Sequence, residues 1–244
     1  MKSPRLAYTQ KLLCKKAIVY DLYKQKILPM KSILKKITLG VFTLATATSF
    51  SAQKIDAKAK SLLDAVAQNY KSKNNVYFKF VYGTGTGKTV TKTEPGIFYS
   101  AKDKYKLKIM GTEQIFDGNK IYNISEEDQE ITVAKPTGNE QMFSPLNYIG
   151  EYKKGYTVKY LGKKTVNGVN TDQIKLIPTT KNGIKEVNLF INDAKKQIVK
   201  LEQFSTDNSV SVIAISDYKV NQNLSSNMFS FDKNDYKNYI YTEL

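Results

Sequence analysis

The chain has 244 residues and a formal net charge of +16, from 38 basic and 22 acidic residues. It contains no histidine and a single cysteine, Cys14, which excludes a serine–histidine nucleophile, a histidine-ligated zinc site and an internal disulfide. An enzyme of this composition would have to work with carboxylates, lysines or tyrosines.

The first 52 residues have the layout of an export signal that starts at an internal methionine. Three lysines follow Met30 closely, an uncharged apolar run extends over residues 37–50, and small residues lead up to Ala52. We therefore expect residues 30–52 to be a secretory signal peptide, because the run is short for a membrane span. Residues 1–29 are then either a start codon assigned too early or a cytoplasmic extension.

Residues 53–244 are expected to form one exported domain. They hold 28 lysines and 21 acidic residues, a net charge of +7, and the chain's one arginine, Arg5, lies outside them. Dispersed lysine is typical of a solvated face, whereas nucleic-acid readout favours clustered arginine with aromatic residues. No cysteine follows the signal to accept a lipid. We expect a soluble periplasmic monomer with no nucleic-acid partner, cofactor or metal.

An amphipathic helix is predicted first in this domain, over residues 55–70. Its apolar residues share one helical stripe: Ile55, Ala59, Leu62, Leu63, Val66 and Tyr70. Strand patterns take over after it, beginning with VYFKFVY (76–82), GIFYSA (96–101) and KYKLKIM (104–110). Further strands are predicted at 113–116, 120–124, 130–134, 157–161, 172–178, 184–191, 197–204 and 209–218. Asp117-Gly118 and Asn167-Gly168 are tight-turn signals between such runs.

The segment YGTGTGKTV (82–90) ends like a phosphate-binding loop. The motif G-x-x-x-x-G-K-[ST] would place its first glycine at Tyr82, and the chain continues into strand-like TVTKTEPG instead of a helix. A glycine-rich hairpin connection is therefore favoured over a nucleotide site.

Four carboxylates stand close together in YNISEEDQEITV (122–133), namely Glu126, Glu127, Asp128 and Glu130. Three interpretations are open: the hydrated tip of a hairpin, an opportunistic divalent-ion site, or a pair of catalytic acids. A calcium loop needs fixed ligand spacing and a turn glycine, which this segment lacks. We expect the hairpin tip.

A second helix is predicted within MFSPLNYIGEYKKGY (142–156). Ser144 can cap its start, Pro145 suits the first helical position and Gly155 can close the end. Phe143 and Tyr148 can form a hydrophobic staple across that start. The helix carries more apolar surface than one narrow stripe needs, so it is either ordinary core or a lid over an apolar cavity.

The order of these pieces resembles the LolA-like periplasmic lipoprotein carriers, in the form found in Bacteroidetes. The resemblance covers most of residues 53–244 and is carried by six segments: FKFVYGTGTGK, PGIFYSAKDKYKLKIM, IFDGNKIYNISEEDQEITV, SPLNYIG, QIKLIPTTKNGIKEVNLFIN and MFSFDKNDY. It implies an α+β, mostly β fold, in which a strongly curved antiparallel sheet forms an unclosed half-barrel. Helices cover the concave face of that half-barrel.

The resemblance also implies a function without catalysis. Such a carrier accepts acylated lipoproteins from an inner-membrane ABC transporter, shields their acyl chains, and delivers them to an outer-membrane acceptor. Two alternatives are a sensor or binding module of the same fold that regulates a partner such as an anti-sigma factor, and a carboxylate-based hydrolase.

Strand parity and the resemblance together nominate an acyl-binding site. The predicted wall residues are Phe78, Phe80, Phe98, Tyr105, Leu107 and Ile109, and the predicted lid residues are Met142, Phe143, Leu146 and Ile149. Each of them is equally consistent with filled core. In the family an arginine after the second strand holds the lid closed; the matching position is Lys102, whose ammonium lacks the planar fork of a guanidinium.

Overall fold

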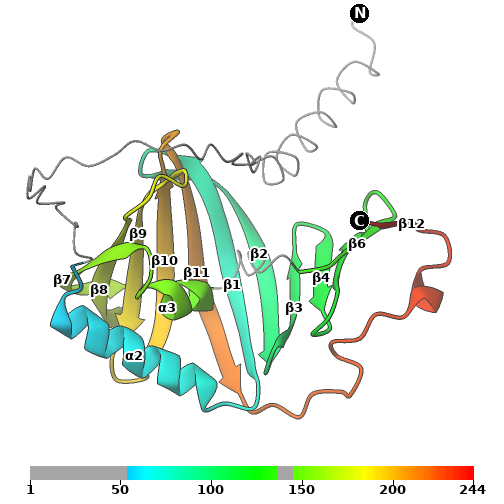
Figure 1. Cartoon of the computed structure of the whole chain (residues 1–244), viewed down its shortest axis with the longest axis horizontal. Coiled ribbons are helices and arrows are strands. Elements are labelled where there is room, and N and C mark those ends of the chain that lie inside the picture. The colour runs from blue at the N-terminus through cyan, green and yellow to red at the C-terminus, as the bar shows by residue number, and fades with distance from the viewer. Residues whose placement is uncertain (1–53, 137–144) are drawn as a thin grey trace, which may run out of the picture. The chain divides into compact units, whose positions relative to one another are not determined.

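A computed structural model describes residues 54–136 and 145–244 of the chain (Figure 1). The predicted signal peptide and the residues Met142, Phe143 and Ser144 lie outside this part of the chain. Within it, no helix combines the length and the apolar character needed to cross a membrane.

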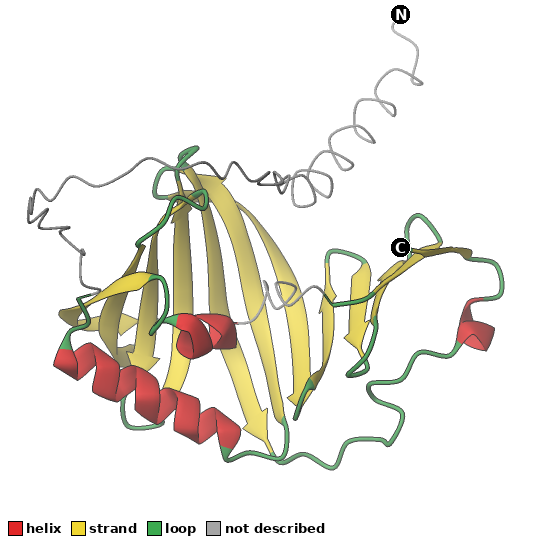
Figure 2. Ribbon diagram, in the orientation of Figure 1, coloured by secondary structure: helices red, strands yellow, loops and turns green. Residues whose placement is uncertain are grey.

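Twelve strands form one sheet in the order β12-β6-β5-β4-β3-β2-β1-β11-β10-β9-β8-β7. Figures 1 and 2 show the sheet bending around two helices that lie against its concave side. The strands are β1 (Val76–Thr86), β2 (Thr89–Ala101), β3 (Lys104–Ile109), β4 (Thr112–Phe116), β5 (Ile121–Ser125), β6 (Glu130–Ala134), β7 (Tyr156–Val166), β8 (Val169–Pro178), β9 (Ile184–Asn192), β10 (Gln197–Ser205), β11 (Ser209–Val220) and β12 (Ile240–Glu243).

Most strand neighbours are antiparallel and follow one another along the chain, as short connections favour. The two predicted tight turns are confirmed, because Gly118 has a φ of 97° and Asn167 and Gly168 have φ values of 48° and 76°. The YGTGTGKTV segment is a hairpin: β1 runs to Thr86, and the chain turns at Gly87 into β2. The predicted hairpin connection is therefore confirmed.

Two pairings are parallel and depart from the predicted all-antiparallel sheet. β12 pairs in parallel with β6, from Ile240 opposite Glu130 to Glu243 opposite Val133. Ile55 forms an isolated parallel bridge with Val158 of β7, so the prediction that Ile55 belongs to the first helix is wrong. The backbone of Asp56 donates to Val158 O, which keeps the chain extended up to the helix start.

The first helix is α2 (Ala57–Lys71), and its predicted apolar stripe is buried from Ala59 to Tyr70. Asp56 caps its start: Oδ1 accepts from the backbone N–H groups of Lys58 and Ala59 at 2.9 and 3.0 Å. The second is α3 (Pro145–Glu151), with Pro145 at its first position as predicted. Gly155 lies in the turn after the helix, four residues beyond Glu151, and has a φ of 85°, the left-handed conformation that glycine adopts readily after helices.

The main core lies between these helices and the concave face of strands β1–β3 and β7–β11. It combines the helical stripe with alternate residues of each strand, such as Leu63, Phe78, Leu189 and Ile213. We call the concave face of the whole sheet, including that of β4–β6, the inner wall.

The apolar side of the sheet changes at β4. In register, Lys106 of β3 stands opposite Ile115 of β4, so Ile115 faces away from the inner wall, and Ile124 and Ile131 share that outer side. A second core forms there under the C-terminal segment 221–244. Its cover consists of aromatic residues: Phe231, Tyr236, Tyr239 and Tyr241.

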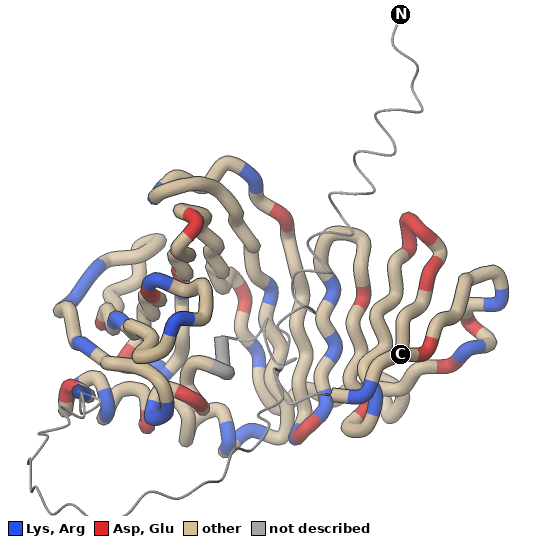
Figure 3. Tube along the Cα trace, turned by 45° about the horizontal axis from the view of Figure 1, so that its top comes forward, with Lys and Arg blue, Asp and Glu red and all other residues tan. Residues whose placement is uncertain are grey.

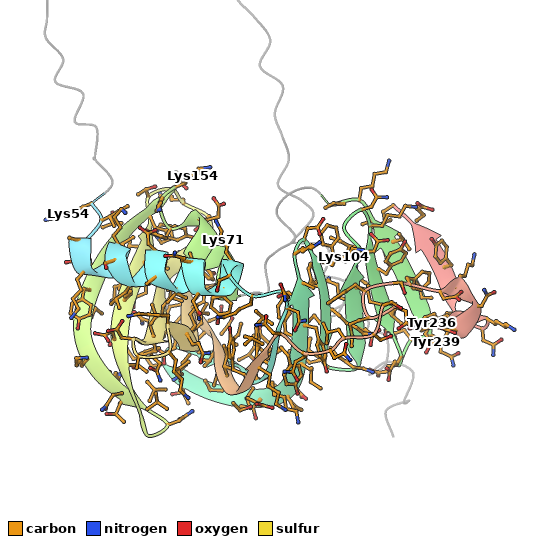
Figure 4. All side chains as sticks on the ribbon, turned by 90° about the horizontal axis from the view of Figure 1, so that it is seen from below. Lys54, Lys71, Lys104, Lys154, Tyr236 and Tyr239 are labelled. Carbon is orange, nitrogen blue, oxygen red and sulfur yellow. The ribbon has the colours of Figure 1, made fainter. Side chains whose placement is uncertain are left out.

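This C-terminal cover was not expected from the sequence. Phe231 stacks on Tyr122 with ring centroids 4.4 Å apart, and Tyr236 stacks on Phe231 at 5.4 Å. Tyr236 belongs to a short 3₁₀ helix, η2 (Lys233–Tyr236), and Figure 4 shows Tyr236 and Tyr239 beside the strands at that end of the sheet. The segment thus supplies β4–β6 with an outer layer that the two helices do not reach.

Candidate functional site

The six predicted wall residues come together on the inner wall. Phe78, Phe80, Phe98, Leu107 and Ile109 belong to one buried cluster and are between 2% and 8% exposed, and Tyr105 packs against them. Of the predicted lid residues, Ile149 of α3 joins the same cluster. Leu146 lies in α3, but its side chain, like Met142 and Phe143, is outside the described part of the chain.

Aromatic rings form a continuous row across four strands of this wall. Phe78 stacks on Phe98 with centroids 4.9 Å apart, and Phe98 stacks on Tyr105 at 6.1 Å. Tyr105 continues to Phe116 of β4 at 5.6 Å, and Phe80 meets Phe78 edge-on at 5.9 Å. The row is a long apolar strip with few polar groups, and Phe78, Phe80 and Phe98 are buried within the main core of the described structure.

A hollow of about 280 Å³ lies where β2 and β3 end, lined by residues 94–97 and 108–111. Gly96 is one of its lining residues, and a Cβ there would lie 2.2 Å from Cζ of Phe80. The volume is slightly below the roughly 300–1,000 Å³ typical of small-molecule sites.

A polar border marks where the apolar lining ends. The hydroxyl of Tyr105 donates to Oε1 of Gln114 at 2.7 Å, and Nε2 of Gln114 donates to Oδ1 of Asn123 at 2.5 Å. In register, Thr132 of β6 continues the same line of residues opposite Asn123. The inner wall is therefore apolar on β1–β3, and on β4–β6 it combines the apolar residues Phe116 and Ile121 with a line of uncharged polar groups.

Helix α3 is tied to α2 by one carboxylate. Oδ1 of Asp64 on α2 accepts from the Tyr152 hydroxyl at 2.8 Å and pairs with Nζ of Lys153 at 2.7 Å. Oδ2 of Asp64 pairs with Nζ of Lys60, one turn away on α2, also at 2.7 Å. Three donors thus converge on Asp64, and two of them come from the turn that directly follows α3.

The electrostatics favour the ionised form of this carboxylate. Burial by itself would raise the pKa of Asp64, but hydrogen bonds from Lys153, Lys60 and Tyr152 outweigh it and hold the pKa well below its usual value. Asp64 was not singled out from the sequence, because a charged residue on a helix is locally typical of a solvent-exposed position. Its partners Tyr152 and Lys153, in the turn after α3, lie 88 and 89 positions away in the chain.

A second contact fastens α3 to the sheet, since the Tyr148 hydroxyl donates to Oε1 of Gln203 on β10. The position matching the family's latching arginine, Lys102, is instead an exposed residue in the turn between β2 and β3, with a φ of 53°. In the described structure, Asp64 and Gln203 provide side-chain partners for α3 and the turn after it, and the Tyr152 hydroxyl also lies 3.5 Å from the Lys60 carbonyl oxygen.

The acidic segment that opens β6 is the tip of a hairpin, as expected. Ser125 pairs with Glu130 at the ends of β5 and β6, and the Ser125 hydroxyl donates to Oδ2 of Asp128 at 2.9 Å. Glu126 reaches Lys108 at 3.1 Å. Among the residues that the structure describes, no group of three or more His, Cys, Asp or Glu side chains is placed to hold a metal ion. Figure 3 shows basic and acidic positions interspersed along the strands.

Comparison with known proteins identifies relatives in structure but none in sequence. No protein-family model matches the chain, and no curated protein matches it. An uncharacterized conserved protein from Thermus thermophilus is similar in structure, with a TM-score of 0.54 and 10% identity over 77% of this chain and 99% of that one.

Two further structures give lower scores. A LolA superfamily protein from Nitrosomonas europaea gives a TM-score of 0.37 at 13% identity, over 71% of this chain and 98% of that one. The MucA–MucB complex of Pseudomonas aeruginosa gives 0.40 at 10% identity, over 72% and 62%. At these identities the likeness concerns the fold alone, and the Bacteroidetes type stays a prediction. The described residues have the architecture that was predicted: an open, curved half-barrel of strands with helices over its concave face.

Proposed function

We propose that this protein is a periplasmic carrier that shields the acyl chains of lipoproteins between the inner and the outer membrane. The observation that supports it is the inner wall: a continuous apolar and aromatic surface, lined by Phe78, Phe98, Leu107 and their neighbours, beneath a helix held by polar contacts. Its partners would be acylated lipoproteins, an inner-membrane ABC transporter and an outer-membrane acceptor.

The energetics require such a surface. Keeping one methylene group out of water is worth about 0.8 kcal/mol, so a chain of fourteen methylenes needs roughly 11 kcal/mol of shelter. Burial against an apolar wall supplies this without a cofactor or a chemical step. Release then requires a cover that can move, and α3 is the candidate: it is a short helix held by the packing of Ile149 and by polar contacts with Asp64 and Gln203.

The inner wall is tested by photocrosslinking with a matched control on the same strand. p-Benzoylphenylalanine is placed at Tyr105, which faces inward, or at Lys106, which faces outward and pairs with Glu113 at 2.8 Å. The purified protein is incubated with a triacylated lipopeptide and illuminated. We expect crosslinks from position 105 and few from position 106.

Native mass spectrometry of protein purified from the periplasm gives an independent measurement. We expect bound lipid, or uptake of the added lipopeptide in a one-to-one complex. No bound lipid in either preparation, together with equal crosslinking from both positions, would overturn carriage. Recovery of a regulatory protein in place of lipid would favour the sensor alternative.

A further inference from the structure

Two tyrosines meet at the end of the aromatic row nearest to the end of α2. Tyr70 lies in the last turn of α2, and Tyr218 lies on β11 directly opposite Phe78 of β1. Their rings pack edge to face with centroids 5.8 Å apart. The pair therefore extends the row Phe78–Phe98–Tyr105 by two rings that each carry a hydroxyl.

Both hydroxyl oxygens are buried, and within the described residues neither makes a hydrogen bond of normal length and angle; they interact only weakly with each other and, at Tyr70, with the Ile198 backbone. Tyr70 is 8% exposed as a residue. Buried polar groups in folded proteins are almost always hydrogen-bonded, so a pair of unsatisfied hydroxyls at one place calls for a physical reason. Phenylalanine at either position would keep the ring packing and remove the cost of the buried hydroxyl.

The surroundings define what these hydroxyls can bind. Burial raises the pKa of Tyr218 to about 12 and raises that of Tyr70 as well, so both remain protonated and act as donors. Besides burial, weak hydrogen bonding to Tyr218 and to the Ile198 backbone shifts the pKa of Tyr70, and weak hydrogen bonding to Tyr70 shifts that of Tyr218; within the described structure none of these groups is charged. A carboxylate or phosphate would lose its hydration there with no cation to compensate. An uncharged oxygen acceptor fits.

We propose that the hydroxyls of Tyr70 and Tyr218 bind the carbonyl oxygen of an acyl ester whose hydrocarbon chain lies along the aromatic row. A carbonyl oxygen has two lone pairs and accepts from two donors, which matches the two phenols. This inference rests on the proposed function, because it names the polar contact that positions the chain within the same wall.

The test uses methyl palmitate with an isotope-labelled carbonyl as the probe, in the wild type and in the variants Tyr70→Phe, Tyr218→Phe and the double variant. Infrared difference spectra report hydrogen bonding to the bound carbonyl directly. We expect a carbonyl band shifted to lower frequency in the wild type and a return to the unbonded frequency in the double variant. Each single variant should weaken methyl palmitate binding about 2- to 12-fold, the worth of one net hydrogen bond.

Two controls separate this contact from general effects on the wall. Tyr77→Phe removes a hydroxyl from a buried tyrosine on the opposite face of β1, where its ring packs on Tyr99 at 4.8 Å, and should leave the band unchanged. N-Phenyl-1-naphthylamine, which has no carbonyl, should bind the wild type and the double variant equally. Thermal stability should not fall in the Tyr→Phe variants, because each loses an unsatisfied group.

The outcomes distinguish this inference from the function on which it rests. Methyl palmitate that binds with an unshifted carbonyl band, equally in the wild type and the double variant, would overturn the ester contact and leave acyl binding intact. Absence of binding by both methyl palmitate and N-phenyl-1-naphthylamine would overturn both. Competition by a triacylated lipopeptide, compared with phosphatidylglycerol, then assigns the ester to a lipoprotein or to a free glycerolipid.

Discussion

Replacing Asp64 by alanine should open α3 while leaving the rest of the fold in place. The substitution removes the 2.8 Å hydrogen bond from Tyr152, whose residue is 0% exposed, and the 2.7 Å pair with Lys153. A hydrogen bond to a charged acceptor contributes about 1.5–3 kcal/mol and an exposed ion pair about 0.2–1 kcal/mol. Alanine is a better helix former than aspartate, which offsets part of the loss on α2. We therefore expect Asp64→Ala to lower the free energy needed to open α3 by about 1–3 kcal/mol.

Hydrogen exchange measured by mass spectrometry reports the change in the free energy of opening at α3 itself. The backbone N–H of Tyr152 bonds to Tyr148 O at 3.1 Å, so its exchange reports opening of α3. We expect exchange in a peptide covering residues 145–152 to accelerate by roughly 5- to 150-fold, with peptides from β8 and β9 unchanged.

Two milder variants form a graded series with Asp64→Ala. Lys153→Met removes one ion pair and should accelerate exchange less than about 5-fold. Asp64→Asn keeps an acceptor for Tyr152 but loses the charge, and should fall between the other two. Equal exchange of the 145–152 peptide in the wild type and in Asp64→Ala would refute the argument that Asp64 holds α3.

The same contact has a defined pH dependence. Because the pKa of Asp64 is lowered in the folded protein, its stabilisation is fully present above the ordinary aspartate value of about 4 and is lost as the pH falls toward the lowered value. We expect exchange at α3 to be insensitive to the Asp64→Asn substitution only under strongly acidic conditions. A difference that persisted unchanged to the lowest pH would argue for packing, rather than charge, as its cause.

Three further substitutions test other parts of the structure. Gly96→Ala would place a Cβ 2.2 Å from Cζ of Phe80. It should lower the free energy of unfolding, measured by urea denaturation, by about 1–3 kcal/mol and should reduce acyl binding. An unchanged denaturation midpoint would show that Phe80 repacks freely. Phe231→Ala removes a ring stacked on Tyr122 at 4.4 Å and should lower the free energy of unfolding by about 2–3 kcal/mol. Hydrogen exchange should become faster in β4–β6 and β12 alone, and a uniform acceleration along the sheet would contradict a local cover. Asp56→Ala removes the acceptor for two N–H groups at the start of α2 and should lower stability by about 0.5–2 kcal/mol, checked by thermal denaturation against Asp56→Asn, which retains a cap.

The sequence predicted the elements well because their signals are local. The apolar stripe of Leu62, Leu63 and Val66 lies within a single helix, and the alternation of Tyr105, Leu107 and Ile109 lies within a single strand. Parity tells which residues of a strand share a face, and the inner-wall residues could be grouped on that basis before the sheet was seen.

Long-range pairing was not readable in the same way. In β4, Gln114 and Ile115 alternate as expected, but only the register with β3 shows that Ile115 faces outward. The strand that starts at Ile240 is four residues long and pairs in parallel with β6, which lies more than a hundred positions earlier. Its own sequence is too short to predict this pairing. The C-terminal cover was missed for this reason.

A cover over an apolar wall is useful to a carrier only if closed and open states differ by a small free energy. A gap of a few kcal/mol leaves roughly 0.1–10% of molecules open, which permits exchange while most wall surface stays shielded. Fully apolar packing of α3 would make opening more costly with every buried side chain. Ile149 and the adjoining Tyr152 are buried in the main core and contribute some of this packing, whereas Asp64 and Gln203 hold the helix through contacts that water can replace. In the proposed carrier, this polar part of the fastening keeps the free energy of opening lower than apolar packing of the same extent would.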